Sequence, residues 1–120
     1  MKDIFIKSKI KNKDEEIPFE GKGTLDEEKN LIQYQDDKAV LTIFLDDNIM
    51  LRETEDTILS YKFVENEKTN FEVFLKDLKQ TGFVPMQTFN INKDNTTYEV
   101  IYKIDGNDFK HEFKVEWRLI

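Results

Sequence analysis

The sequence predicts an all-β protein, a single antiparallel meander of about eight to ten short strands that forms a small barrel. Apolar residues recur at every second position along much of the chain, which is the pattern of half-buried strands. Polar turn sequences separate these segments at intervals of roughly 10–12 residues, as they do in β-barrels and sandwiches. The length of 120 residues suits one domain, which covers residues 1–120.

The clearest element is a hairpin at the C-terminal end. Residues 109–119 alternate between charged side chains and apolar ones, with His111 as the only exception on the apolar face. Residues 97–104 alternate in the same way and place Tyr98 and Tyr102 on one face. Between them lies Asp-Gly-Asn-Asp at 105–108, whose pairs tolerate the positive φ of tight hairpin turns. A two-residue loop at 105–106 or 106–107 puts both apolar rows on the same face of the sheet.

Shorter apolar runs with polar boundaries predict the remaining strands, at residues 4–10, 17–25, 31–35, 39–45, 49–55, 57–64 and 83–91. Gly21 and Gly23 fall within the second of these segments. Glycine in a strand is typical of a bend or bulge, so we expect the barrel wall to turn a corner there.

Residues 71–80 fit two patterns. A helical stripe is formed by Phe71, Phe74, Leu75 and Leu78. One face of a strand is formed equally well by Phe71, Val73 and Leu75. The surrounding β pattern favours a strand, with one short helix near 70–80 as the alternative. Such a helix would plug one end of the barrel and leave the fold class unchanged.

Composition excludes several partners. The net charge is −7, both signs are scattered along the chain, and Arg52 and Arg118 are the only arginines, so we expect no nucleic-acid partner. Cysteine is absent, which excludes disulfides and thiolate metal sites. No apolar run approaches the roughly 20 residues of a membrane span, and the first residues lack the pattern of a signal peptide. We therefore expect a cytoplasmic protein with no membrane partner.

The sequence offers little for catalysis. Ser8 and Ser60 are the only serines, and neither lies in a nucleophile elbow that His111 could serve as a base. The acidic pairs lie in predicted turns, and the ligand spacing of a calcium-binding loop is missing. The glycine pattern of a phosphate-binding loop is also missing. We therefore expect no enzymatic activity, no catalytic residues, no metal and no cofactor.

The barrel interior is the remaining candidate site. Apolar cavities with a few convergent polar groups are typical of ligand sites. The polar residues predicted to point inward are Ser8, Arg52, Ser60 and His111. The predicted ligand site consists of Arg52, Ser60 and His111, with Tyr102 as a hydrogen-bond partner for the histidine. The alternative interpretation places Arg52 on the outer face and makes His111 a satisfied residue of the wall.

Three features together resemble a known family: the Gly21-centred strand, the meander of short strands and the stretch TFNINKDNTTYEVIYKIDGNDFKHEFKVEW. The family is the YwiB-like bacterial family of unknown function. The resemblance spans nearly the whole chain and implies a calycin-type, lipocalin-like β-barrel with no established catalytic residues. We therefore expect a small non-enzymatic barrel that binds a small apolar or amphipathic ligand in its interior. The alternative is a protein-interaction or assembly module, a monomer or homodimer, that uses an exposed edge or aromatic patch.

Overall fold

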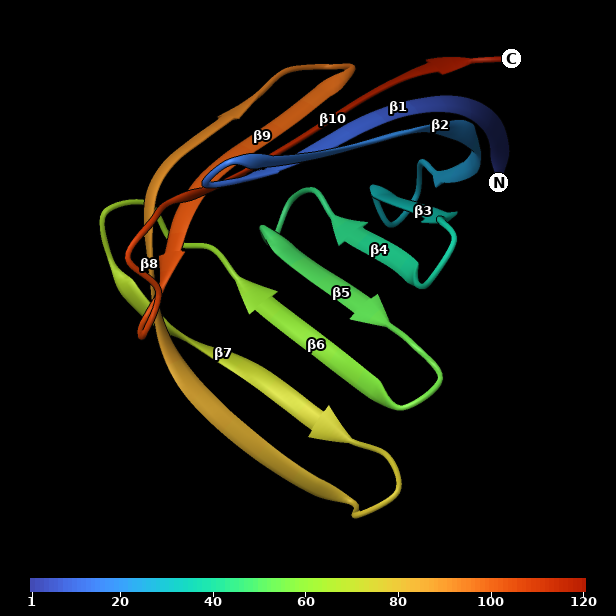
Figure 1. Cartoon of the computed structure of the whole chain (residues 1–120). Helices are drawn as coiled ribbons and strands as arrows, with labels where there is room; N and C mark the ends of the chain where they lie inside the picture. Colours follow the sequence, from blue (N-terminus) through green and yellow to red (C-terminus); the bar gives the residue numbers. More distant parts are fainter.

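A computed structural model describes all 120 residues as a closed antiparallel β-barrel of ten strands (Figure 1). The strands are β1 (Lys2–Asn12), β2 (Glu15–Asp26), β3 (Leu31–Gln35), β4 (Val40–Phe44), β5 (Ile49–Glu53), β6 (Thr57–Lys62), β7 (Lys68–Leu75), β8 (Gln80–Lys93), β9 (Thr97–Ile104) and β10 (His111–Leu119).

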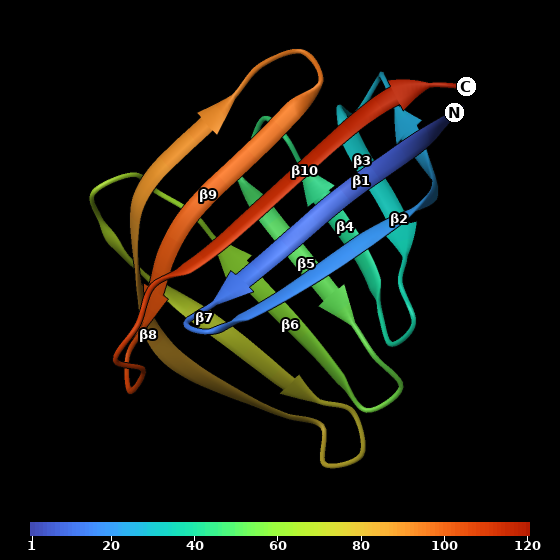
Figure 2. The same cartoon turned by 45° about the horizontal axis from the view of Figure 1, so that its top comes forward.

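Each strand pairs with the next one along the chain, and β10 returns to pair with β1. This closing pair runs from Ile4 opposite Leu119 to Asn12 opposite His111. The two chain ends therefore lie next to each other at one end of the barrel (Figure 2). The predicted all-β meander is confirmed, and no helix that could cross a membrane is present.

The C-terminal hairpin has the predicted register. His111 lies opposite Tyr102, which is the pairing that a two-residue loop at 106–107 specifies, and both apolar rows face inward. The predicted strand was wrong at its start, where Phe109 and Lys110 lie outside β10. The Asp105 amide donates to the Pro85 carbonyl of β8, and Asn107 bonds the ring of His111. The Asn107 backbone amide also donates to the Ile104 carbonyl over 3.1 Å, which closes a tight turn around residues 105–106.

Residues 71–80 form the end of β7, a turn and the first residue of β8, so the alternative of a short helix is wrong. Phe71 is buried and pairs with Val84, whereas the exposed Glu72 pairs with Phe83 on the other face. Pairing with β6 on one side and β8 on the other satisfies the backbone, which outweighs the helical spacing of the apolar residues.

The second strand pairs along its whole length with β1 but meets β3 only over Gly23–Asp26. A Cβ atom at Gly23 would lie 2.7 Å from the Gln33 carbonyl oxygen and 2.4 Å from Ile6 Cδ1. The missing side chain therefore lets β3 approach β2. The register with β1 continues through Gly21 and Gly23, so the predicted bulge is absent from this pairing. The first half of β2, residues 15–22, has no strand beside it on that edge.

The longest strand, β8, is shared between two neighbours. Residues 80–87 pair with β7 and residues 86–93 pair with β9, with a register shift between Thr88 and Asn90. Phe89 lies in this bulge, and the Lys110 ammonium lies 4.3 Å from the centre of its ring. The bulge lets β8 bend between its neighbours. Residues 80–85 consequently have no partner strand on the β9 side, where the β7–β8 hairpin projects from the barrel (Figure 1).

The middle of the barrel is filled with side chains. Buried residues come from every strand except β2. The fully buried ones include Ile4, Ile6, Ile32, Leu41, Ile43, Val100, Phe113 and Val115. Barrels of this size close their centre with side chains or hold one small ligand. Here the core separates two mouths. The terminal mouth carries the chain ends, and the opposite mouth, which we call the Arg52 mouth, carries the hairpin loops after β1, β3, β5, β7 and β9.

Candidate functional site

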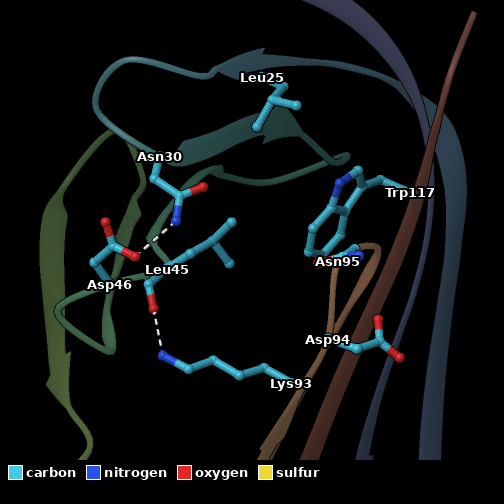
Figure 3. A pocket seen from close by; sticks show the side chains of 8 residues that line it. All are labelled: Leu25, Asn30, Leu45, Asp46, Lys93, Asp94, Asn95 and Trp117. Atoms are coloured by element: carbon cyan, nitrogen blue, oxygen red, sulfur yellow. Dashed lines mark hydrogen bonds between the residues drawn. The ribbon is translucent and has the colours of Figure 1, made fainter.

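Each mouth of the barrel contains a cavity. The terminal mouth holds a cavity with a volume of about 350 Å³, which lies between Leu25 of β2, Leu45 after β4 and Trp117 of β10 (Figure 3). Its remaining lining residues are polar, namely Asn30, Asp46, Lys93, Asp94 and Asn95. We call it the terminal cavity.

Most polar groups of the terminal cavity are already bonded to the protein. The Asn30 amide donates to Asp46 over 2.7 Å. Lys93 extends from β8 toward the β4–β5 loop, where its ammonium donates to the Leu45 carbonyl over 2.8 Å (Figure 3). The same ammonium donates to Asn48 over 3.1 Å. The Tyr98 hydroxyl also donates to Asn48. These bonds tie loops together across the mouth, so the cavity is better explained as a bonded closure than as a ligand site.

The Arg52 mouth holds a cavity of about 220 Å³, which we call the Arg52 cavity. Eight of its eleven lining residues are hydrophobic or aromatic. The lining consists of Ile10, Asn12, Ile17, Leu41, Met50, Arg52, Tyr61, Tyr102, Ile104, His111 and Phe113. These residues come from seven of the ten strands, so the cavity is part of the barrel interior.

Strand register points Arg52 into this cavity. On β5 it lies opposite Leu41 of β4 and Leu59 of β6, on the same face as the buried Met50. The next residue, Glu53, faces the other way and forms a salt bridge of 2.7 Å with Lys76. The alternation of the strand therefore separates the guanidinium from its neighbouring carboxylate. None of the salt bridges or side-chain hydrogen bonds of the protein involves Arg52.

Three buried tyrosines lie in the electrostatic field of Arg52. Burial raises the pKa of Tyr34 to about 12, and it also raises the pKa values of Tyr61 and Tyr102, because a phenolate is poorly solvated there. The positive charge of Arg52 opposes this shift of the pKa in all three. The tyrosines are therefore neutral hydroxyl groups at physiological pH, gathered around one cation.

His111 is held in the wall of the cavity. Its ring stacks on Tyr102 with the centroids 5.1 Å apart, and Phe109 lies edge-on at 4.9 Å. The Nδ1 atom is hydrogen-bonded to Asn12, and Nε2 is hydrogen-bonded to Asn107 over 3.1 Å. Burial lowers the pKa of His111, so the imidazole is neutral at physiological pH. The interpretation of His111 as a bonded wall residue is supported, but Tyr102 is its stacking neighbour and not its hydrogen-bond partner.

The structure brings three of the four predicted site residues together in the Arg52 cavity: Arg52, Tyr102 and His111. The alternative interpretation, which placed Arg52 on the outer face, is wrong. Ser60 was also predicted to point inward, and this prediction is wrong. It lies opposite Leu51 and Glu72 on the outer face, because the neighbouring Tyr61 of β6 points into the barrel.

Two residues with polar groups in the cavity, Tyr61 and Asn12, were missed in the sequence. Tyr61 shares a face with Leu59 and Phe63, and this row of large apolar residues was the signal that β6 turns its odd-numbered side inward. Asn12 continues the inward row of Ile6, Ser8 and Ile10 at the end of β1. Its polar side chain gave no reason to extend that row.

The ten-stranded closed meander places the protein among the small up-and-down β-barrels. Its fold is similar to that in the crystal structure of the YwiB protein from Bacillus subtilis. The TM-score is 0.65, the sequence identity is 14%, and the match covers 98% of this chain and 90% of that chain. The sequence matches no protein-family model and no curated protein. The resemblance seen in the sequence is thus confirmed at the level of the fold.

Proposed function

We propose that the protein is a non-enzymatic, cytoplasmic, calycin-type barrel that binds a small amphipathic ligand in the Arg52 cavity. The observation that carries this proposal is an unpaired guanidinium facing a cavity with a mainly apolar lining. Ligand sites combine such a lining with a few polar groups that fix the orientation of the ligand. The two mouths differ in this respect, because the polar groups of the terminal cavity are mostly bonded to one another.

The volume of the Arg52 cavity limits the ligand. About 220 Å³ is below the roughly 300–1,000 Å³ of pockets for drug-sized molecules. At the ~30 Å³ that one water molecule occupies in the liquid, the cavity holds roughly seven water-sized groups. A short aliphatic or aromatic molecule with one polar end fits this volume, whereas a long-chain lipid exceeds it unless its chain leaves the barrel.

A route to the cavity is provided by the unpaired first half of β2. Residues 15–22 have no strand on the β3 side, and Ile17 from this half lines the cavity while 45% exposed. Local opening is easiest where few backbone hydrogen bonds have to break. A small ligand can therefore enter between β2 and β3 without separating any of the paired strands.

Methyl-group NMR tests the proposal and locates the site. We expect titration with hexanol or hexanoate to shift the methyl signals of Ile17, Leu41 and Ile104, which line the Arg52 cavity. The methyl signals of Leu25 and Leu45 in the terminal cavity serve as the internal control and stay in place. A variant that fills the cavity, Ile104→Trp, loses the response, whereas Leu25→Trp keeps it. If neither probe moves the signals of the Arg52 cavity, the proposal is overturned.

A second candidate function is self-assembly through the free edge of β8, residues 80–85. The Pro85 carbonyl accepts from Asp105 on the side away from β7, so the alternate residues Thr81 and Phe83 also direct their N–H and C=O groups to the free side. Phe83 is 59% exposed. Unpaired edges of this kind are templates for pairing with another strand.

The partner we propose for this edge is a second copy of the chain. Residues 80–85 carry no charge, and two copies can pair antiparallel about Gly82, where an added side chain would meet nothing within 4 Å. The other free edge, in β2, is protected by Pro18 between Glu16 and Glu20. Charged residues opposite their own copies destabilise a pair, so the β8 edge suits a dimer better than the β2 edge does.

Sedimentation analysis over a range of protein concentrations tests the dimer. We expect reversible dimerisation that is lost in Phe83→Glu, because this change places two carboxylates beside the shared edge. Leu78→Glu is the matched control, since Leu78 is equally apolar and 63% exposed but lies in the turn outside the edge. A protein that stays monomeric at its highest soluble concentration would contradict this second candidate.

A further inference from the structure

We infer that the ligand of the Arg52 cavity carries a carboxylate, and that this carboxylate pairs with the guanidinium of Arg52. The inference rests on the proposed function of the cavity as a ligand site. It adds the chemical class of the ligand, which is a short organic acid with an apolar body.

The first step is the charge. Arg52 is the only charged residue among the eleven that line the cavity, since His111 is neutral there. Glu53, the nearest carboxylate along the chain, is turned to the outer face and paired with Lys76. A partly buried cation without a protein partner favours an anion in the cavity, because the surrounding apolar groups screen the attraction less than water does.

The second step is the supply of hydrogen-bond donors. The guanidinium has five N–H donors in a planar fork that matches a carboxylate. Tyr61 and Tyr102 line the same cavity, and the hydroxyl of neither takes part in a hydrogen bond within the protein. Both remain protonated and can donate to an anion. The ring centroids of these tyrosines lie 5.8 Å apart, and the charge of Arg52 acts on the pKa of both hydroxyls.

The third step excludes other polar ends. An amine would bring a second positive charge to Arg52 and is repelled. An alcohol can use the same hydroxyl groups but leaves the guanidinium without a counter-charge. A phosphate monoester carries up to two negative charges at neutral pH, and one cation in a mainly apolar cavity compensates only one of them. A monoanionic carboxylate matches both the charge and the fork.

The apolar body of the acid then has a defined place. Ile10 and Ile17 from β1 and β2, Leu41 from β4 and Phe113 from β10 provide the apolar part of the lining. Burial of aliphatic groups contributes roughly 25 cal/mol per Å² of apolar surface, so the body supplies affinity while the carboxylate sets the orientation. This division of roles is typical of small-molecule sites.

Three probes with the same chain length test the inference, namely hexanoate, hexanol and hexylamine, each titrated into the protein and followed by the methyl signals of Ile17, Leu41 and Ile104. We expect hexanoate to bind at least about tenfold more tightly than hexanol, in line with the strength of charge-assisted hydrogen bonds. Hexylamine should bind more weakly than hexanol.

Variants of the two arginines give the matched comparison. Arg52→Gln should lose the tenfold preference for hexanoate and keep the affinity for hexanol, whereas Arg118→Gln should change neither. Arg118 suits this control because it stacks on Phe5 at 5.0 Å and lies outside the Arg52 cavity. Arg52→Lys, which keeps the charge but not the fork, should retain part of the preference and serves if the glutamine variant does not fold.

The outcomes separate the two levels of the proposal. Equal binding of hexanoate and hexanol, unchanged in Arg52→Gln, overturns the carboxylate inference and leaves the cavity as a ligand site. Binding of none of the probes at the Arg52 cavity overturns both. A hexanoate preference that survives Arg52→Gln but disappears in Lys93→Gln would move the anion to the terminal cavity and contradict the assignment to Arg52.

Discussion

The imidazole of His111 stacks on the ring of Tyr102, the residue opposite it on the neighbouring strand, at a centroid distance of 5.1 Å and an interplanar angle of 22°. Asn12 and Asn107 bond the two ring nitrogens from either side. The histidine thus links β1, β10 and the β9–β10 loop at the edge of the Arg52 cavity. Protonation of this ring disturbs one end of the barrel wall.

The stability of the protein should therefore fall in mild acid. Burial lowers the pKa of His111 below its ordinary value of 6.5, which we take for the unfolded chain. Between the two pKa values the unfolded chain binds more protons, so the unfolding free energy decreases as the pH falls from 6.5 through the folded-state pKa, and is unaffected by this group above 6.5. Urea unfolding at a series of pH values measures the effect.

Acidic residues also titrate in mild acid, so the histidine variant provides the control. In His111→Gln the part of the pH dependence that comes from the ring is removed, and the variant should lose less stability than the natural sequence between pH 7 and pH 5. Identical pH profiles for the two proteins would show that the protonation of His111 is not coupled to folding.

Replacement by alanine should have different effects at two glycines. Gly23 lies where β3 approaches β2 closely, whereas Gly82 of β8 faces open space. In Gly23→Ala the new Cβ lies 2.7 Å from a backbone oxygen of Gln33, which cannot move without separating the two strands. We expect a loss of about 1–3 kcal/mol in the unfolding free energy. In Gly82→Ala the new atom meets nothing within 4 Å. A change between zero and a gain of about 1 kcal/mol is expected, because alanine restricts the unfolded chain.

Urea denaturation of both variants measures this difference. A Gly23→Ala protein as stable as Gly82→Ala would mean that β2 and β3 can separate at no cost. The contact between β2 and β3 would then be less closely packed than the structure shows.

The sequence predicted those features that depend on strand alternation. The register of the C-terminal hairpin followed from His111 and its apolar neighbours, because a shift of one residue would have buried charged side chains. The face of Ser60 was predicted wrongly, because residues 57–64 contain apolar side chains on both faces. The helix–strand ambiguity of residues 71–80 was resolved only by β6 and β8, which are distant contacts that a local pattern does not contain.

The candidate site was predicted in part for the same reason. The inward direction of Arg52, Tyr102 and His111 could each be predicted from the alternation of side chains along one strand. Their meeting in one cavity, with Arg52 from β5 and the other two from β9 and β10, depends on barrel closure. Asn12 and Asn107, which bond His111, lie 99 and 4 residues from it along the chain, and no spacing rule connects them. The asparagines could therefore be assigned only from the folded barrel.

Thr88 should be replaceable with a gain in stability. Its side-chain oxygen is fully buried and has no hydrogen-bond partner. Every other fully buried side-chain nitrogen or oxygen of the protein is hydrogen-bonded. Valine has nearly the same shape and removes the unsatisfied hydroxyl, so we expect Thr88→Val to raise the unfolding free energy by about 1 kcal/mol. Thermal unfolding measures the change.

The companion variant for this position is Thr88→Ala, which removes the hydroxyl and also a buried methyl group. It should be less stable than Thr88→Val by about 1 kcal/mol, because it leaves a small cavity in the core. If Thr88→Val is itself destabilised, the hydroxyl has a partner such as a buried water, and the site is wet.

The unpaired guanidinium of Arg52 should lower the stability of the protein when no ligand is bound. Its positive charge is partly removed from water, faces apolar groups and gains no salt bridge in return. Arg52→Met keeps the aliphatic stem of the side chain and removes this charge, and we expect an unfolding free energy higher by about 0.5–2 kcal/mol. Arg118→Met is the control, because loss of its contact with Phe5 leaves stability unchanged or lower by up to about 1 kcal/mol.

The same pair of variants separates a ligand-binding role of Arg52 from a structural one. A residue kept for packing stabilises the protein, and its replacement by methionine would lower the thermal midpoint. A residue kept for an anion destabilises the empty barrel, and saturating hexanoate should raise the midpoint of the natural sequence more than that of Arg52→Met. A lower midpoint for the variant without hexanoate, together with equal shifts on adding it, would assign Arg52 to the framework of the barrel and remove it from the site.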